Sequence, residues 1–391
     1  MTSTLRVNAL LLTLIILSGI RVALFAAQLS SDPLVYDAHA SSLSDASTTP
    51  LLAEVVAPVV RHVAPPSAVK ALYMTSWVAG TPTLRKKVFD LLDETEANAI
   101  VIDIKDYTGR ISFEVHDPKL AAVGSVERRI ADIRGLVDEL HAKGIYVIGR
   151  ISSFQDAYLA SHRPDLAIHK LSDDGVWKDT KGVAWLDESN KEVWDYLVSI
   201  ARESYAQGFD ELNFDYVRFP SDGNLKDFKF VSYDPKTKTK AEQIKEFFTY
   251  LHKELAGTGP FISADLFGLT SSSKDDLGIG QVLENAAPYF DYIAPMIYPS
   301  HYASGFLNFK NPADHPYEVI LSEMKTASER LLAASSTSAK LRPWLQDFNL
   351  GATYTPAMIR QEKKAVYDAG LTGWMMWSAS NNYTKAALDL K

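Results

Sequence analysis

Two aspartates carry the chemistry that the sequence suggests most directly. Asp215 lies in residues 209–223 (FDELNFDYVRFPSDG), where a buried strand is followed by a Pro-Ser-Asp-Gly turn. Asp265 lies in a second apolar run, residues 261–267. An unpaired carboxylate in a protein interior costs several kcal/mol, so Asp215 needs a partner, and Arg218 is the nearest cation along the sequence. The segment predicts either a structural Asp–Arg pair or a reactive carboxylate at a strand end.

Short apolar runs and longer helical patterns alternate from Lys70 to the end of the chain, as is typical of parallel β/α folds. The apolar runs cover residues 71–77, 99–105, 145–151, 212–217, 261–267, 292–298, 342–347 and 373–378. Helical patterns cover residues 83–94, 130–143, 191–206, 241–255, 316–334 and 355–369, and Gly144, Gly208 and Gly370 follow three of them as expected C-caps. Eight such units in about 320 residues predict an α/β protein with a (β/α)8 TIM barrel. The alternative, an open doubly wound sheet, lacks its usual Gly-x-Gly-x-x-Gly motif here.

The carboxyl ends of the strands carry the active site of such barrels, so the side chains predicted there form the candidate site. Nearly every predicted strand ends in a polar or aromatic group, which a purely structural barrel does not require. The catalytic candidates are Asp215 and Asp265. The candidates for substrate binding are Asp103, Lys105, Arg150, Arg218, Tyr298, His301, Gln346, Asp347, Trp77 and Trp377. Near the same ends we expect Ser76, Asp106, Gln155, Asp156, Ser380 and Asn381.

Carboxylates and aromatic rings dominate this set, a composition that favours glycoside hydrolysis. That reaction uses two carboxyl groups beside a glycosidic bond, one as proton donor and one as nucleophile or base. Trp185 and Trp344 add flat faces on which sugar rings can stack, although a single Trp is more often a core residue. Metal-dependent hydrolysis is a rival, but His301 is the single His at a predicted strand end and the other His residues lack metal-binding spacing. A Ser-His-Asp hydrolase would carry a Gly-x-Ser-x-Gly motif, which is absent. We therefore expect neither metal nor cofactor.

The two aspartates are expected to differ in protonation. Arg218 would keep Asp215 ionised, whereas burial among apolar neighbours would raise the pKa of Asp265 and make it the general acid/base. Asp103 and Tyr298 would hold sugar hydroxyls or tune the pair. A separation of the two carboxyl groups of about 5 to 5.5 Å would indicate a retaining enzyme, and about 6.5 to 9.5 Å an inverting one. The long connection at residues 154–185 could wall one side of the mouth.

The N-terminal region predicts export. Residues 7–20 are almost wholly apolar, and after Arg21 the apolar run resumes to residue 27. We interpret residues 1–27 as a signal peptide cleaved near Ala26 and Ala27, or as a retained signal anchor, with a buried core helix as the alternative. Residues 28–68 are rich in Ser, Ala, Thr and Pro and predict a disordered linker, which leaves residues 69–391 for the barrel. The barrel would be extracytoplasmic, and either membrane-anchored or secreted.

Charge and composition limit the classes of binding partner that we expect. The formal net charge of −8 and the lack of clustered Lys and Arg argue against nucleic acid. The absence of Cys excludes disulfides, thiolate metal sites and a Cys nucleophile. A carbohydrate polymer is the expected partner, together with a membrane if the N-terminal segment is retained.

Six motifs resemble, in the same order, the family described as a "putative glycosyl hydrolase domain" and catalogued as domain of unknown function 4015. They are ALYMT at 71–75, NAIVIDIKD at 98–106, NFDYVRFP at 213–220, APMIYPSHY at 294–302, RPWLQDF at 342–348 and GWMMW at 373–377. The resemblance covers nearly all of residues 69–391. It implies a TIM barrel and an activity directed at sugars.

A looser likeness links the chain to family 18 chitinases. Asp210, Asn213, Asp215 and Val217 lie in register with the Asp-x-x-Asp-x-Asp-x-Glu strand of that family, and residues 296–298 and Trp377 are similar to its sixth and eighth strands. Val217 stands where the chitinases have their acid Glu, so the resemblance implies a different mechanism. Barrels that cleave α-linked sugars with a strand-four Asp nucleophile and a strand-five acid are a closer analogy.

The candidate residues and the resemblances together predict two functions of different classes. The first is a retaining glycoside hydrolase with Asp215 as nucleophile and Asp265 as acid/base. The second is a barrel at the cell surface that binds glycan without cleaving it, because Val217 has replaced the acid. A surface-anchored scaffold that touches no sugar comes third, and would leave the polar strand ends unexplained.

Overall fold

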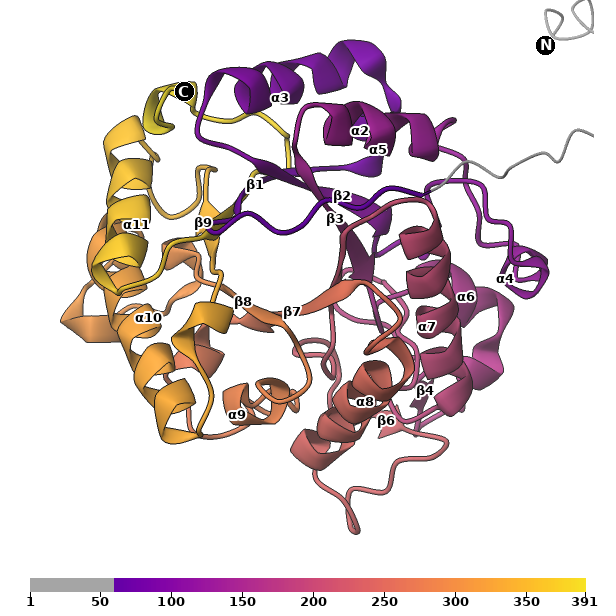
Figure 1. The fold of residues 1–391 in the computed structure, drawn as a ribbon. Coiled ribbons are helices and arrows are strands. Elements are labelled where there is room, and N and C mark those ends of the chain that lie inside the picture. The colour runs from indigo at the N-terminus through magenta and orange to yellow at the C-terminus, as the bar shows by residue number, and fades with distance from the viewer. Residues whose placement is uncertain (1–59) are drawn as a thin grey trace, which may run out of the picture. The chain divides into compact units, whose positions relative to one another are not determined.

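The computed structural model describes residues 60–391, which contain a closed barrel of eight parallel strands in the order β1-β10-β9-β8-β7-β5-β3-β2 (Figure 1). The predicted (β/α)8 barrel is confirmed. The barrel strands are β1 (Lys70–Met74), β2 (Ala99–Lys105), β3 (Tyr146–Ser152), β5 (Glu211–Asp215), β7 (Phe261–Phe267), β8 (Tyr292–Met296), β9 (Trp344–Gln346) and β10 (Trp374–Trp377).

Helices surround the barrel on its outer side (Figure 1). The six long ones, which match the predicted helical patterns, are α3 (Pro82–Glu94), α5 (Ile133–Ala142), α7 (Lys191–Ala206), α8 (Lys240–Leu255), α10 (Pro316–Ala333) and α11 (Pro356–Asp368). The short ones are α2 (Ser76–Gly80), α4 (Pro118–Ala122), α6 (Ala157–His162) and α9 (Leu283–Ala286). Single 3-10 turns lie at Pro164–Leu166, Gly268–Ser271, Pro299–His301, Phe306–Asn308, Pro312–Asp314, Ser338–Lys340 and Lys385–Ala387, and β4 (His169–Lys170) pairs antiparallel with β6 (Phe228–Lys229).

Local sequence signals fix where these helices begin and end. α8 starts with a capping box in which the Thr239 hydroxyl accepts from the Glu242 backbone and the Glu242 carboxylate accepts from the Thr239 backbone. Gly144, Gly208 and Gly370 adopt left-handed φ angles of 72°, 108° and 82° just after helices. Glycine occupies this conformation without steric penalty, so the predicted C-caps are confirmed.

The core has two layers. The larger packs strands against helices, and the smaller fills the barrel interior with alternate strand residues such as Tyr73, Val101 and Ile148. Alternation continues toward the carboxyl ends of the strands. The parity that faces the interior therefore delivers five polar side chains to that end: Tyr73, Asp103, Arg150, Asp215 and Asp265.

The first strand is shorter than residues 71–77. β1 ends at Met74, and Thr75 is the N-cap of α2, with its side chain accepting a hydrogen bond from the backbone of Val78 at 3.2 Å. A Ser-, Thr- or Asp-type cap favours helix initiation over strand continuation at this point. Ser76 and Trp77 consequently belong to α2 and are not at a strand end.

The chain reaches β1 across the amino-terminal end of the barrel. The His62 ring stacks on Tyr205 at 3.9 Å, and the Val63 backbone donates to Asp210 Oδ1 at 2.7 Å. Asp210 lies directly before β5 and also accepts from the Val147 backbone at 2.8 Å and pairs with His141 at 2.9 Å. In Figure 1 this leading segment crosses in front of the barrel, so the view is onto the end where the strands begin.

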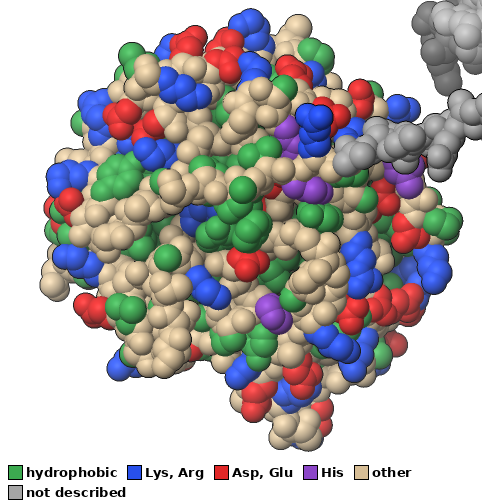
Figure 2. All heavy atoms as spheres, in the orientation of Figure 1, with side chains coloured by type: hydrophobic (Ala, Val, Ile, Leu, Met, Phe, Trp, Pro, Cys, Tyr) green, Lys and Arg blue, Asp and Glu red, His purple; other side chains and the backbone are tan. Residues whose placement is uncertain are grey.

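On this face acidic and basic side chains are interspersed around the rim (Figure 2). Within residues 60–391, no helix has both the length and the hydrophobicity needed to cross a bilayer. The predicted signal segment 1–27 and most of the predicted linker 28–68 lie outside the described residues.

Candidate active site

A cavity of about 430 Å³ opens at the carboxyl ends of strands β3, β5, β7, β8, β9 and β10. Its volume is in the range of small-molecule sites. The lining residues are Arg150, Asp215, Tyr216, Arg218, Asp265, Phe267, Gly268, Leu269, Met296, Tyr298, His301, Tyr302, Trp344 and Trp377. The walls are thus mostly aromatic or apolar, with four charged groups among them.

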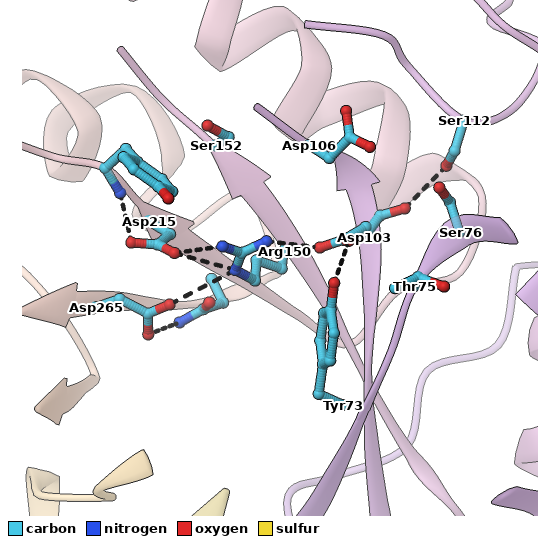
Figure 3. Close-up of polar contacts among 12 residues, drawn as sticks. Tyr73, Thr75, Ser76, Asp103, Asp106, Ser112, Arg150, Ser152, Asp215 and Asp265 are labelled. Atoms are coloured by element: carbon cyan, nitrogen blue, oxygen red, sulfur yellow. Dashed lines mark hydrogen bonds and ion pairs between the residues drawn. The ribbon is translucent and has the colours of Figure 1, made fainter. Parts of the chain in front are cut away.

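Arg150 is the central charge of the site (Figure 3). Its Nη1 donates to Asp103 Oδ1 at 2.7 Å, and its Nη2 and Nε donate to Asp215 Oδ2 at 2.5 and 3.1 Å. Its Nε lies 3.9 Å from Asp265 Oδ2. Burial acts to lower the pKa of Arg150, but Asp215 and Asp103 outweigh it and raise that pKa well above its usual value. The guanidinium therefore stays charged and links strands β2, β3, β5 and β7.

Asp215 is held at both oxygens. Oδ2 accepts from Arg150, and Oδ1 accepts from the backbone N–H of Tyr216 at 2.6 Å. Tyr216 has a φ of 53°, a left-handed conformation that is uncommon for an aromatic residue. Such backbone strain tends to occur at functional sites, where the surroundings over-determine it. Here the turn places the Tyr216 ring on the cavity wall beside the carboxylate.

The expected pair between Asp215 and Arg218 is not formed; the partner is Arg150. The left-handed turn at Tyr216 ends the strand alternation directly after Asp215. Arg218 is carried to another part of the cavity wall, while Val217 packs into the outer core with no exposed surface. The prediction of Arg218 as the partner of Asp215, which was based on proximity in the sequence, is therefore wrong.

Asp265 is 1% exposed, and one of its carboxyl oxygens, Oδ1, accepts two hydrogen bonds. Its Oδ1 accepts from Trp344 Nε1 at 2.7 Å and from Asn213 Nδ2 at 2.9 Å. Burial, followed by the charge of Asp215, raises the pKa of Asp265 to about 8, and the nearby Arg150 and the two donors only partly oppose this. The direction and the main cause are those expected from the sequence. At neutral pH Asp265 is then a carboxylic acid, next to the arginine-bound Asp215.

The two aspartates lie close together. Arg150 Nε is 3.1 Å from Asp215 Oδ2 and 3.9 Å from Asp265 Oδ2, so these two oxygens lie within about 7 Å of each other. Both residues line the same cavity. This bound between two oxygens is compatible with the spacing of a retaining enzyme.

Asp103 contacts Arg150 but does not line the cavity. It is 3% exposed, accepts from Tyr73 Oη at 2.5 Å and from Arg150, and is not part of the cavity lining. Burial raises the pKa of Asp103, while Arg150 and the Tyr73 hydroxyl oppose the rise. Asp103 is therefore placed to orient Arg150 and not to touch a ligand directly.

The cavity brings together seven of the predicted site residues, namely Arg150, Asp215, Arg218, Asp265, Tyr298, His301 and Trp377. Lys105 is not among them. A register shift between Asp103 and Lys105 in the β2–β3 pairing ends the alternation, so that Lys105 pairs in register with Ile151 of the outer core. Its ammonium instead contacts Asp156 at 2.7 Å, with both side chains fully buried.

Three further predicted residues also lie outside the lining. Gln346 is fully buried, donates to Phe348 O at 2.9 Å and accepts from the Ser300 hydroxyl at 2.8 Å. Asp347 accepts from the Thr384 backbone and hydroxyl at 2.7 and 2.8 Å. Trp77 is 56% exposed on α2, beneath the guanidinium of Arg129 at 4.7 Å.

Several cavity residues were not assigned from the sequence. Tyr216, Phe267, Met296 and Tyr302 line the cavity, and Tyr73 stacks on Trp377 at 4.0 Å while holding Asp103. Strand alternation alone would have found Tyr73, because it has the same parity as Ala71. Phe267 and Met296 end β7 and β8 with the parity of Asp265 and Ala294, so alternation would have found them too. Tyr216 and Tyr302 lie beyond the strand ends, where alternation does not apply. Trp185, expected to stack on sugars, is buried beneath Arg218.

The family is identified by sequence. The family model described as "Putative glycosyl hydrolase domain" matches residues 71–383, which include every residue of the site. The chain belongs to this family. No curated protein sequence matches the chain. The family assignment supports glycosidase activity in general terms, and the resemblance seen in the six sequence motifs is confirmed.

Two solved structures share this fold, and a third is similar in sequence. The PgaB (BpsB) glycoside hydrolase domain from Bordetella bronchiseptica is 11% identical, with 83% of this chain and 99% of that chain covered and a TM-score of 0.60. A chitobiase from Flavobacterium johnsoniae is 13% identical, with 82% and 47% covered and a TM-score of 0.50. A hypothetical protein from Ruminiclostridium thermocellum is 35% identical over 53% of this chain and 98% of its own, with a TM-score of 0.45.

Among residues 60–391, no group of three or more His, Cys, Asp or Glu side chains is arranged to hold a metal ion. The acids of the site are instead arranged around a guanidinium.

Proposed function

We propose that the chain is a retaining glycoside hydrolase with Asp215 as nucleophile and Asp265 as general acid/base. One observation carries this proposal: two carboxyl groups of neighbouring strands line one cavity in different surroundings. Arg150 binds the carboxylate of Asp215, while burial keeps a proton on Asp265. Two-carboxylate glycosidases need this division of roles.

The reaction would proceed in two steps. In the first, an Asp215 oxygen bonds to the anomeric carbon while the glycosidic C–O bond breaks, and the leaving oxygen takes the proton of Asp265. In the second, Asp265 as carboxylate removes a proton from water, whose oxygen displaces Asp215 and restores both residues. Arg150 would hold the Asp215 carboxyl group in position between turnovers.

A chitinase-type division of roles is less well supported. Val217, at the position of the chitinase acid, has no exposed surface and packs in the outer core, so it leaves no acid there. Asn213 hydrogen-bonds to Asp265 and thereby serves the acid of the neighbouring strand. The proposed proton donor is therefore on β7, beside the nucleophile on β5.

The proposed substrate is a polysaccharide outside the cytoplasm. Tyr298, Trp344 and Trp377 provide rings around the acidic pair, as expected of a site that packs against sugar faces. Export would depend on residues 1–27, as a cleaved signal or as an anchor in the membrane. Within the family's general glycosidase activity, this assigns the barrel to cell-surface or extracellular glycan.

The experiment is turnover of a panel of α- and β-linked polysaccharides by three proteins. Wild type should release reducing ends, Asp215→Asn should lose at least about 10³-fold in rate, and Asp291→Asn should retain the activity. Asp291 is a matched control because it lies before β8, at the opposite end of the barrel, where it accepts from the Ile262 backbone. NMR detection of the first-formed anomer tests retention. Equal activity of wild type and Asp215→Asn would contradict the assignment.

A glycan-binding barrel without catalysis is the second candidate. The observation that favours it is the 1% exposure of Asp265, which leaves the proposed acid little access. In that case the panel would show binding without turnover by wild type, and Asp215→Asn would bind as wild type does.

A further inference from the structure

Arg218 is a buried cation on the cavity wall that forms no ion pair with any residue of the described chain. It is 8% exposed and lines the same cavity as Asp215 and Asp265. Its Nη1 donates to Phe219 O at 3.0 Å and to Ser221 Oγ at 3.4 Å. Within residues 60–391, its Nε and Nη2 have no hydrogen-bond acceptor. A guanidinium carries five N–H donors, so several of them lack a partner.

Aromatic rings cover the faces of this guanidinium but cannot satisfy its edge. The guanidinium carbon lies 4.5 Å from the ring centre of Phe267, 5.0 Å from Trp185 and 5.3 Å from Tyr216. Cation–π contacts of this kind stabilise the charge and fix the plane of the group. The N–H donors lie in that plane, where only an acceptor atom can serve them. The rings therefore orient the guanidinium and leave its edge for a ligand.

The nearby acids do not neutralise Arg218. Asp215 is bound by Arg150 at both Nη2 and Nε. Glu188 is fully buried, forms no ion pair with Arg218, and has its pKa raised well above the usual value by that burial, which disfavours its charged form. Asp222 is exposed and accepts from the Thr180 backbone at 3.1 Å. Burial lowers the pKa of Arg218 itself, as expected of a cation whose charge is incompletely compensated.

We propose that Arg218 is the binding site for an anionic group on the sugar, so that the substrate is an acidic glycan. The inference rests on the proposed function, since it names the substrate class of the same site. A carboxylate or a sulfate ester would accept in-plane hydrogen bonds from the free edge of the guanidinium, and the shared cavity puts the charged sugar next to the proposed nucleophile. A neutral glycan that filled the cavity would remove water from the Arg218 guanidinium without supplying a counter-charge.

The test measures binding without turnover, in an Asp215→Asn background, by calorimetry. The probes are two matched pairs: oligogalacturonate with its methyl ester, and sulfated dextran oligomers with plain dextran oligomers. Binding is compared with Arg218 intact, in Arg218→Gln, in Arg218→Lys and in the control Arg202→Gln. Arg202 lies on the outside of α7, where it pairs with Glu254, and tests for general attraction of polyanions.

The expected result is at least about tenfold tighter binding of the charged member in one pair, because the free edge of the guanidinium would form charge-assisted hydrogen bonds with it. Arg218→Gln should abolish the preference and Arg218→Lys should keep part of it. The pair that shows the preference distinguishes carboxylate from sulfate. No preference in either pair, or one lost equally in Arg202→Gln, would overturn the proposal. So would equal loss of charged and neutral ligands in both Arg218 variants, which would make Arg218 a structural residue.

Failure here is separable from failure of the proposed hydrolase. Turnover is scored in wild type on the polysaccharide panel, whereas charge preference is scored in a variant that cannot turn over. A hydrolase that prefers neutral glycan would refute the inference alone, and a charge-selective barrel without turnover would refute the hydrolase alone.

Discussion

At the residue scale, the proton on Asp265 sets the pH range of the proposed reaction. Because the acid must be protonated and its pKa is raised to about 8, we expect kcat/KM to fall as pH rises through about 8. An ordinary carboxylic acid would impose this limit several pH units lower. A pH–rate profile with an active substrate measures it. An alkaline limit below pH 6 would contradict the role of Asp265.

A substitution at Trp344 tests the protonation of Asp265, because the direction of the expected pKa change is known. Its indole N–H donates to Asp265 Oδ1 and thereby favours the charged form of that carboxyl. Trp344→Phe removes the donor, so the pKa of Asp265 should rise and the alkaline limit should move to higher pH. Trp374→Phe is a matched control, since the Trp374 indole donates to Tyr367 outside the cavity. A limit that moves to lower pH, or equally in both variants, would contradict this mechanism.

At the element scale, the register shift in β2 decides what Lys105 does. It pairs with Asp156, and both side chains are fully buried. Lys105→Met leaves the Asp156 carboxylate unpaired and should lower the free energy of unfolding by about 3–5 kcal/mol. The KM of the folded fraction should be unchanged, because Lys105 lies outside the cavity.

Urea unfolding and steady-state kinetics check both statements. Lys86→Met, which removes an exposed i,i+4 pair with Asp90 on α3, should leave the free energy of unfolding nearly unchanged. A raised KM with unchanged stability would instead place Lys105 at the substrate.

The same scale explains what the sequence could predict. The eight strands and six long helices follow from apolar runs, glycine C-caps and capping residues, all of which are local signals. The Asp215–Arg150 pair is not local, because it depends on the register in which Arg150 faces Asn213 across β3 and β5. The predictions for Lys105 and Trp77 were wrong for related reasons. A register shift in β2 before Lys105, and the N-cap before Trp77, each end the strand alternation, and the apolar pattern of the sequence shows neither break. Asp265 could be predicted because burial of its strand is itself a local pattern.

At the scale of the whole molecule, buried acids couple folding to pH. Glu323 on α10 has no exposed surface, and burial raises its pKa to about 7. The folded protein keeps the proton where the unfolded chain has lost it, so stability falls as pH rises from the ordinary glutamate pKa of about 4.3 to about 7, and then levels.

Glu323→Gln should remove this contribution. The difference in the free energy of unfolding between pH 5 and pH 8 should be smaller in Glu323→Gln than in wild type, as measured by urea unfolding at both values. Glu318→Gln, an exposed position on the same helix, should leave the difference unchanged. A larger pH 5 to pH 8 difference in Glu323→Gln would contradict the raised pKa.

The position of residues 60–69 has a consequence for access to the cavity. Residues 62 and 63 dock beside Asp210 at the start of β5, whereas the cavity opens where that strand finishes. Residues 60–69 therefore leave the mouth of the cavity uncovered and do not restrict the approach of a long polymer to it.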